Sequence, residues 1–129
     1  MPKLLLIMMA LVEVGTGSAL LIAPSLVVEL LVGERLSSPQ SLVLGRITGT
    51  ALISIAYACW MASKGEPSGR RGLVGSMVIY NFAVPVLLIC TAINSGMHGI
   101  MLWPACVLHL GLAIWCVFSD LSRPQRYVS

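Results

Sequence analysis

Four long apolar segments, separated by short polar ones, follow one another along this chain. They cover residues 4–23, 42–63, 73–94 and 99–119. Each is close to the length of about 20 residues that an α-helix needs to cross a hydrocarbon core ~30 Å thick. The short alternating segments typical of a transmembrane β-barrel do not occur in the sequence. The pattern therefore predicts an all-α integral membrane protein, folded as a single four-helix bundle over residues 1–129.

Proline, glycine and charged residues mark the ends of the apolar segments. Pro24 ends the first one, because proline lacks a backbone N–H and clashes with the preceding turn. Residues 24–36 are apolar but carry three charged side chains. We therefore expect a short interfacial helix there rather than a second span. Residues 64–71 combine proline, glycine and charge and predict a loop, whereas residues 120–129 form a polar tail.

The composition agrees with a membrane protein and excludes several other classes. Hydrophobic residues make up 57% of the chain and charged residues 10%, whereas about a quarter of a soluble domain is charged. The net charge of +3 comes from basic residues at segment ends, where they anchor helices, so nucleic-acid binding is not expected. The four cysteines lie in apolar segments without a CxxC pair and are expected to pack as small hydrophobic residues.

The distribution of basic residues predicts the orientation of the bundle. Six of them fall on one side of a four-span arrangement: Lys3, Lys64, Arg70, Arg71, Arg123 and Arg126. Only Arg35 lies on the other side, since Arg46 is within the second apolar segment. Lysine and arginine are retained in the cytoplasm during insertion. We therefore expect a multi-pass protein of the inner (plasma) membrane with both termini in the cytoplasm.

Glu13 is the first polar residue within a predicted span that invites a functional interpretation. It lies roughly 13 Å along the first helix, near the bilayer midplane, where a carboxyl group is costly. One hypothesis is a proton-binding or cation-binding carboxyl group. The other is a structural ion pair with Arg46. This residue lies one turn into the second helix, on the outer side, and its long side chain can reach toward the depth of Glu13. Such a pair would hold the first two helices together.

The other polar residues of the spans lie on the second, third and fourth helices. Tyr57 shares a helical stripe with Arg46, and the GxxxG pattern from Gly45 to Gly49 favours close helix packing. Pro85 leaves the carbonyl group of Asn81 without its helical partner, so Asn81 is a candidate for ligand binding or for a hydrogen bond to another helix. Tyr80, on another face, is expected to line a cavity.

His109, near the middle of the fourth helix, is expected to form an interhelical hydrogen bond. Cys106 and His109 could supply two metal ligands, but a closed metal site needs further ligands. No nucleotide-binding loop or catalytic motif occurs in the sequence. We therefore predict no metal site and no catalytic residue, and the sequence identifies no cofactor. The predicted site is a ligand-binding or buried polar seam of Glu13, Arg46, Tyr57, Asn81 and His109.

Two parts of the sequence resemble known families. The glycine-rich first helix, the proline-bounded segment after it and the sequence LGRITGTAL at residues 44–52 resemble small DoxX-like four-helix bacterial membrane proteins. Some of these accompany membrane oxidoreductases that act with quinones. The sequence ALVEVGT at residues 10–16 is similar to the first helix of small multidrug resistance transporters, where a membrane glutamate exchanges protons for cationic drugs. IAYACW at residues 55–60 is similar to their aromatic stretch.

These observations lead to three functional hypotheses. The first is a non-catalytic protein, either an accessory subunit of a membrane complex or a binder of a hydrophobic small molecule such as a quinone or lipid. The second is a proton-coupled transporter of cationic or amphipathic compounds that uses Glu13, Tyr57 and Trp60. The third is a redox or metal enzyme around Cys106 and His109. The expected partners are the lipid bilayer, other membrane subunits or further copies of the chain.

Overall fold

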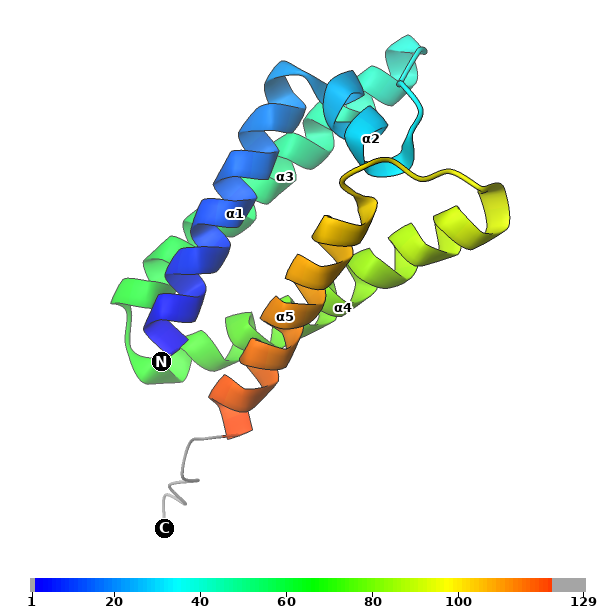
Figure 1. The fold of residues 1–129 in the computed structure, drawn as a ribbon. Coiled ribbons are helices and arrows are strands. Elements are labelled where there is room, and N and C mark those ends of the chain that lie inside the picture. The colour runs from blue at the N-terminus through cyan, green and yellow to red at the C-terminus, as the bar shows by residue number, and fades with distance from the viewer. Residues whose placement is uncertain (1, 122–129) are drawn as a thin grey trace.

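The computed structural model describes residues 2–121, which form five α-helices and no strand (Figure 1). They are α1 (Pro2–Ile22), α2 (Pro24–Val32), α3 (Pro39–Lys64), α4 (Pro67–Ser95) and α5 (Leu102–Leu121). All except α2 contain a segment long and apolar enough to cross a membrane. The predicted all-α fold with four membrane-spanning helices and one short additional helix is confirmed. Arg123, Arg126 and most of the predicted tail lie outside the described residues.

Proline and glycine place the helix ends more sharply than hydropathy does. Proline begins α2, α3 and α4, since its fixed φ angle suits the first helical position and its missing N–H is not needed there. For this reason α4 begins at Pro67, inside the segment predicted as a loop. Gly33 (φ 84°) and Gly96 (φ 65°) end α2 and α4 in the left-handed conformation that glycine adopts without strain.

The helices form two pairs, in which α1 packs along α3 and α4 packs along α5 (Figure 1). The first pair is held at a backbone contact between Gly17 and Gly49. A Cβ atom added to either glycine would lie 2.7 Å from the carbonyl oxygen of the other. Gly45 leaves similar room for Pro24 at the start of α2. The GxxxG pattern is thus used for close helix packing, as predicted.

The two pairs share a hydrophobic core at one end of the bundle, where α1 and α4 begin and α3 and α5 end (Figure 1). The buried side chains of this core come from all four long helices: Leu5, Leu6, Met9, Ala10, Cys59, Val74, Met77, Leu112 and Cys116. Toward the opposite end the pairs diverge, and α2 lies between them there. Apolar packing therefore holds the bundle together mainly at one end.

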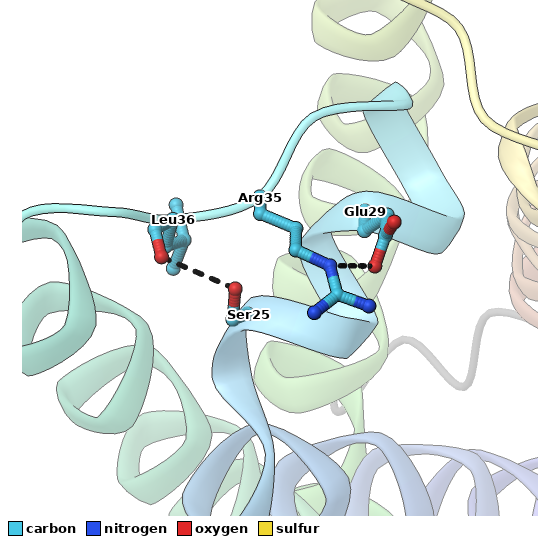
Figure 2. A network of polar contacts seen from close by, with 4 residues as sticks. All are labelled: Ser25, Glu29, Arg35 and Leu36. Atoms are coloured by element: carbon cyan, nitrogen blue, oxygen red, sulfur yellow. Dashed lines mark hydrogen bonds and ion pairs between the residues drawn. The ribbon is translucent and has the colours of Figure 1, made fainter.

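Polar contacts fix α2 to the segment that follows it (Figure 2). The Ser25 hydroxyl group donates a hydrogen bond to the Leu36 carbonyl oxygen over 3.1 Å. Arg35 Nε donates to Glu29 Oε2 over 2.6 Å in an ion pair whose side chains are partly or largely exposed. Both contacts fold residues 33–36 back onto α2.

The segment between α4 and α5 binds the other side of α2. The Gly99 N–H donates to the Leu31 carbonyl oxygen over 3.0 Å, and the Met101 N–H donates to the Leu30 carbonyl oxygen over 2.8 Å. Gly99 lies so close to the Leu30 backbone that a Cβ atom would collide with it. Because residues 99 and 101 make these contacts, α5 begins at Leu102, three residues after the predicted position. They also make α2 a cap that joins the two helix pairs.

At the opposite end, Arg70 closes the C-terminus of α3. Its guanidinium group donates hydrogen bonds to three carbonyl oxygens at the end of that helix, those of Ala62, Ser63 and Gly65. A cation at this position also interacts favourably with the negative end of the helix dipole. Arg70 therefore stabilises the tight connection between α3 and α4.

Candidate functional site

A cavity of about 480 Å³ lies between the two helix pairs, against the inner side of α2. Its lining is apolar apart from the side chains of Thr16 and His109. The lining residues are Val12, Gly15, Thr16, Ala19, Val27, Leu30, Leu31, Val84, Leu88, Met101, Pro104, Ala105, Leu108 and His109. A volume of this size falls within the ~300–1,000 Å³ that small-molecule sites occupy.

Small residues on the facing helices leave this space open. Gly15 and Ala19 lie one turn apart on α1, and Ala105 lies on α5. A Cβ atom added to Gly15 would meet no other atom within 4 Å. The divergence of the pairs and the absence of bulky side chains at these positions together produce the cavity.

A buried polar cluster lies where the packed core gives way to the cavity. The order is the same on three helices. On α1 the core extends to Ala10, and Glu13 lies near the start of the cavity lining, which extends from Val12 to Ala19. On α4 the order is Met77, then Tyr80 and Asn81, then Val84 and Leu88, while on α5 His109 separates the cavity residues from Leu112. The cluster therefore joins the two pairs at the level where apolar packing between them ends.

Glu13 joins this cluster through Tyr80. Its side chain is 2% exposed, and its Oε2 atom accepts a hydrogen bond from the Tyr80 hydroxyl group over 3.3 Å. This bond links α1 of one pair to α4 of the other. A buried carboxyl group requires such a partner, because an unsatisfied polar group in apolar surroundings is strongly unfavourable.

The predicted ion pair between Glu13 and Arg46 is wrong. In the part of the chain that the structure describes, Glu13 contacts Tyr80 and no basic side chain. Arg46 follows Gly45, which packs against Pro24 of α2 and against Leu36, by one residue, or about 100° around the helix axis. The Arg46 side chain is consequently on the exposed outer face of α3.

His109 and Asn81 link α5 to α4. His109 Nδ1 lies 2.8 Å from Asn81 Oδ1, and Asn81 Nδ2 donates a hydrogen bond to the Met77 carbonyl oxygen over 2.9 Å. The His109 ring also packs edge-on against the Tyr80 ring, with a centroid distance of 5.7 Å and an interplanar angle of 79°. The predicted interhelical hydrogen bond of His109 is confirmed, and its partner is the buried Asn81.

The structure thus assembles only part of the predicted seam. Glu13, Asn81 and His109 belong to one cluster, and Tyr80 connects them. The prediction for Tyr80 was cavity lining, but this side chain is not part of the lining of the 480 Å³ cavity. Helical periodicity separates Tyr80 from Asn81 by about 100°. It could not show that α1 and α5 both pack against this side of α4.

Tyr57 lies outside the cluster, on the outer face of the α1–α3 pair. It is 66% exposed and, with Trp60, lines a groove of about 300 Å³ between these helices. Lys64 lies over the Trp60 ring, with its Nζ atom 4.3 Å from the centroid. Glu13 does not line this groove. The structure therefore does not bring the predicted cation-contacting aromatic residues together with the carboxyl group.

Cys106 is buried one turn before His109. In the described part of the chain, no three His, Cys, Asp or Glu side chains come close enough together to hold a metal ion. His109 instead uses one ring nitrogen to contact Asn81.

Comparison with known proteins gives no relative from which a function could be transferred. No protein-family model, no curated protein and no solved structure matches this chain. The resemblances to DoxX-like proteins and to small multidrug resistance transporters therefore remain predictions.

Proposed function

We propose that the protein binds an apolar small molecule within the bilayer, in the cavity between its two helix pairs. The observation that carries this proposal is the cavity itself, whose lining has only two polar side chains, Thr16 and His109. An apolar lining does not hold ordered water well, because a buried water molecule needs two to four polar partners. An apolar occupant fills such a space best.

The surroundings of the cavity support the same function. An empty space would forfeit the dispersion contacts of every side chain that faces it. The cap formed by α2 is fixed on both sides, through Arg35 and through Gly99, and so maintains the cavity in the absence of an occupant. Preformed apolar pockets with a few polar groups are characteristic of small-molecule sites.

The orientation completes this proposal. Lys3, Lys64, Arg70 and Arg71 lie toward the end where the hydrophobic core is, whereas α2 and Arg35 lie toward the opposite end. With the basic end in the cytoplasm of the inner membrane, the cavity opens between the helix pairs in the outer half of the bilayer. The ligand would then be an apolar molecule that dissolves in the membrane.

Native mass spectrometry of the protein extracted from membranes tests this function. We expect a retained apolar molecule on the wild-type protein and its loss in Gly15→Leu, which fills the cavity. Gly111→Leu is the matched control, because Gly111 also has open space around it but does not line the cavity. Equal retention by both variants, or a wild-type protein that carries no such molecule, would refute the proposal.

A further inference from the structure

The hydrogen bonds of Asn81 determine which nitrogen of His109 carries the proton. Asn81 Nδ2 lies 2.9 Å from the Met77 carbonyl oxygen, which can only accept. The NH₂ group must therefore face that carbonyl, and Asn81 Oδ1 faces His109 Nδ1 at 2.8 Å. Because the amide oxygen also only accepts, Nδ1 must be the donor. The neutral imidazole ring is thus held with its hydrogen on Nδ1.

His109 Nε2 is then a hydrogen-bond acceptor without a protein partner. An imidazolium cation is unfavourable in these apolar surroundings, and the carboxyl group of Glu13 is bonded to Tyr80 rather than to His109. Nε2 forms no hydrogen bond with residues 2–121. Since no fully buried side-chain nitrogen or oxygen in this range lacks a partner, Nε2 must be accessible. His109 belongs to the cavity lining.

Thr16 is the other polar side chain of the lining, on α1. Its hydroxyl group also forms no hydrogen bond within the described part of the chain. A hydroxyl group both donates and accepts. Thr16 can therefore pair with a carbonyl, an ether or a hydroxyl group of a ligand, and it does not discriminate among them. His109 Nε2 pairs only with a donor.

We propose, on the basis of the binding function proposed above, that the ligand of this cavity carries a hydrogen-bond donor, such as a hydroxyl group, which donates to His109 Nε2. The ligand is then an apolar molecule with an O–H or N–H group, such as an alcohol or a phenol, and not a ketone, a quinone or an ether. A molecule without a donor would leave Nε2 unpaired in an apolar site. Sites built around one hydrogen bond reject analogues that cannot form it, because the buried polar group then loses its partner.

Nuclear magnetic resonance of the ¹⁵N-histidine-labelled protein in nanodiscs tests this inference without a variant. The chain contains two histidines, and His98 is exposed and does not line the cavity, so its signals serve as an internal control. We expect the free protein to show His109 with hydrogen on Nδ1. Addition of 2-naphthol should shift the Nε2 signal of His109, whereas 2-methoxynaphthalene should not. Hydrogen on Nε2 in the free protein would overturn the inference.

Binding measurements with the same two probes separate this inference from the proposed function. We expect 2-naphthol to bind at least about tenfold more tightly than 2-methoxynaphthalene. In His109→Phe, which keeps an aromatic ring but no acceptor, this preference should disappear while the affinity for the ether remains. Equal affinities in the wild-type protein would overturn the hydroxyl preference alone. If neither probe binds and no molecule is retained in membranes, the binding function itself is refuted.

Thr16→Val is the matched variant for the second polar group. We expect this variant to weaken the binding of both probes by a similar factor, because the Thr16 hydroxyl group can form a hydrogen bond with either kind of ligand oxygen. Loss of the naphthol preference in Thr16→Val, with the preference intact in His109→Phe, would assign the discrimination to Thr16 and contradict the role inferred for His109.

Discussion

The contact between Gly17 and Gly49 allows the stability of the first helix pair to be predicted from distances. In Gly49→Ala, the new Cβ atom would lie 2.7 Å from the Gly17 carbonyl oxygen, 3.0 Å from Leu20 Cβ and 3.0 Å from the Leu21 nitrogen. Two of these atoms are backbone, so no side-chain rotation relieves the contact. The helices must separate by about 0.3–0.7 Å before the oxygen lies at 3.0–3.4 Å, which is still a tight contact.

We expect Gly49→Ala to lower the free energy of unfolding. Overpacking of a tight interface costs about 1–3 kcal/mol, and the higher helix propensity of alanine offsets at most ~1 kcal/mol of this. The net loss is therefore about 0–3 kcal/mol, with a central value of ~1 kcal/mol. It can be measured by titrating the protein in mixed micelles with sodium dodecyl sulfate and following helicity by circular dichroism.

Gly111→Ala is the control, because a Cβ atom at Gly111 meets no other atom within 4 Å. It should leave the free energy of unfolding unchanged or raise it slightly. The double variant Gly17→Ala/Gly49→Ala should lose less than the sum of the single losses, because one separation of the helices relieves both contacts. Equal stability of Gly49→Ala and Gly111→Ala would refute the close approach of α1 and α3.

Further predictions concern the polar residues. Tyr80→Phe should lower the free energy of unfolding by about 1–3 kcal/mol, because it leaves the Glu13 carboxyl group without its partner. The control Tyr57→Phe should change this free energy by less than ~0.5 kcal/mol. The same micelle titration measures both variants. Arg46→Gln should also change the free energy of unfolding by less than ~0.5 kcal/mol, and Arg70→Gln, which removes the carbonyl contacts at the end of α3, should cost ~1 kcal/mol. A loss in Arg46→Gln as large as that in Tyr80→Phe would show that Glu13 depends on Arg46 after all.

The polar cluster holds the two helix pairs together at the inner end of the cavity. It joins α1 to α4 through Glu13 and Tyr80, and α4 to α5 through Asn81 and His109. On one side of the cluster, where α1 and α4 begin, the pairs share the hydrophobic core. On the other side, toward α2, they enclose the cavity. The same side chains that hold the diverging helices together therefore also set the hydrogen-bonding character of the cavity's polar end.

Local chemistry in the sequence was sufficient to predict the helices. Hydropathy determines which segments favour a membrane, and an unbroken apolar run forces the backbone to satisfy its hydrogen bonds within a helix. The short α2 followed from its charges and from Pro24, and the close packing at Gly49 followed from the glycine spacing. The helix ends were predicted less accurately, because Pro67 begins a helix within a polar segment that predicts a loop.

The partners of the polar residues were decided only by the tertiary structure. Periodicity places a side chain on a face of its helix, but not opposite a particular neighbour. Opposite charges and the reach of the long Arg46 side chain favoured Arg46 as the partner of Glu13, whereas helix packing turned Arg46 outward and brought Tyr80 to the carboxyl group. The cavity likewise depends on how far two helix pairs diverge. That divergence arises from contacts between residues distant in sequence, through the core at one end and α2 at the other.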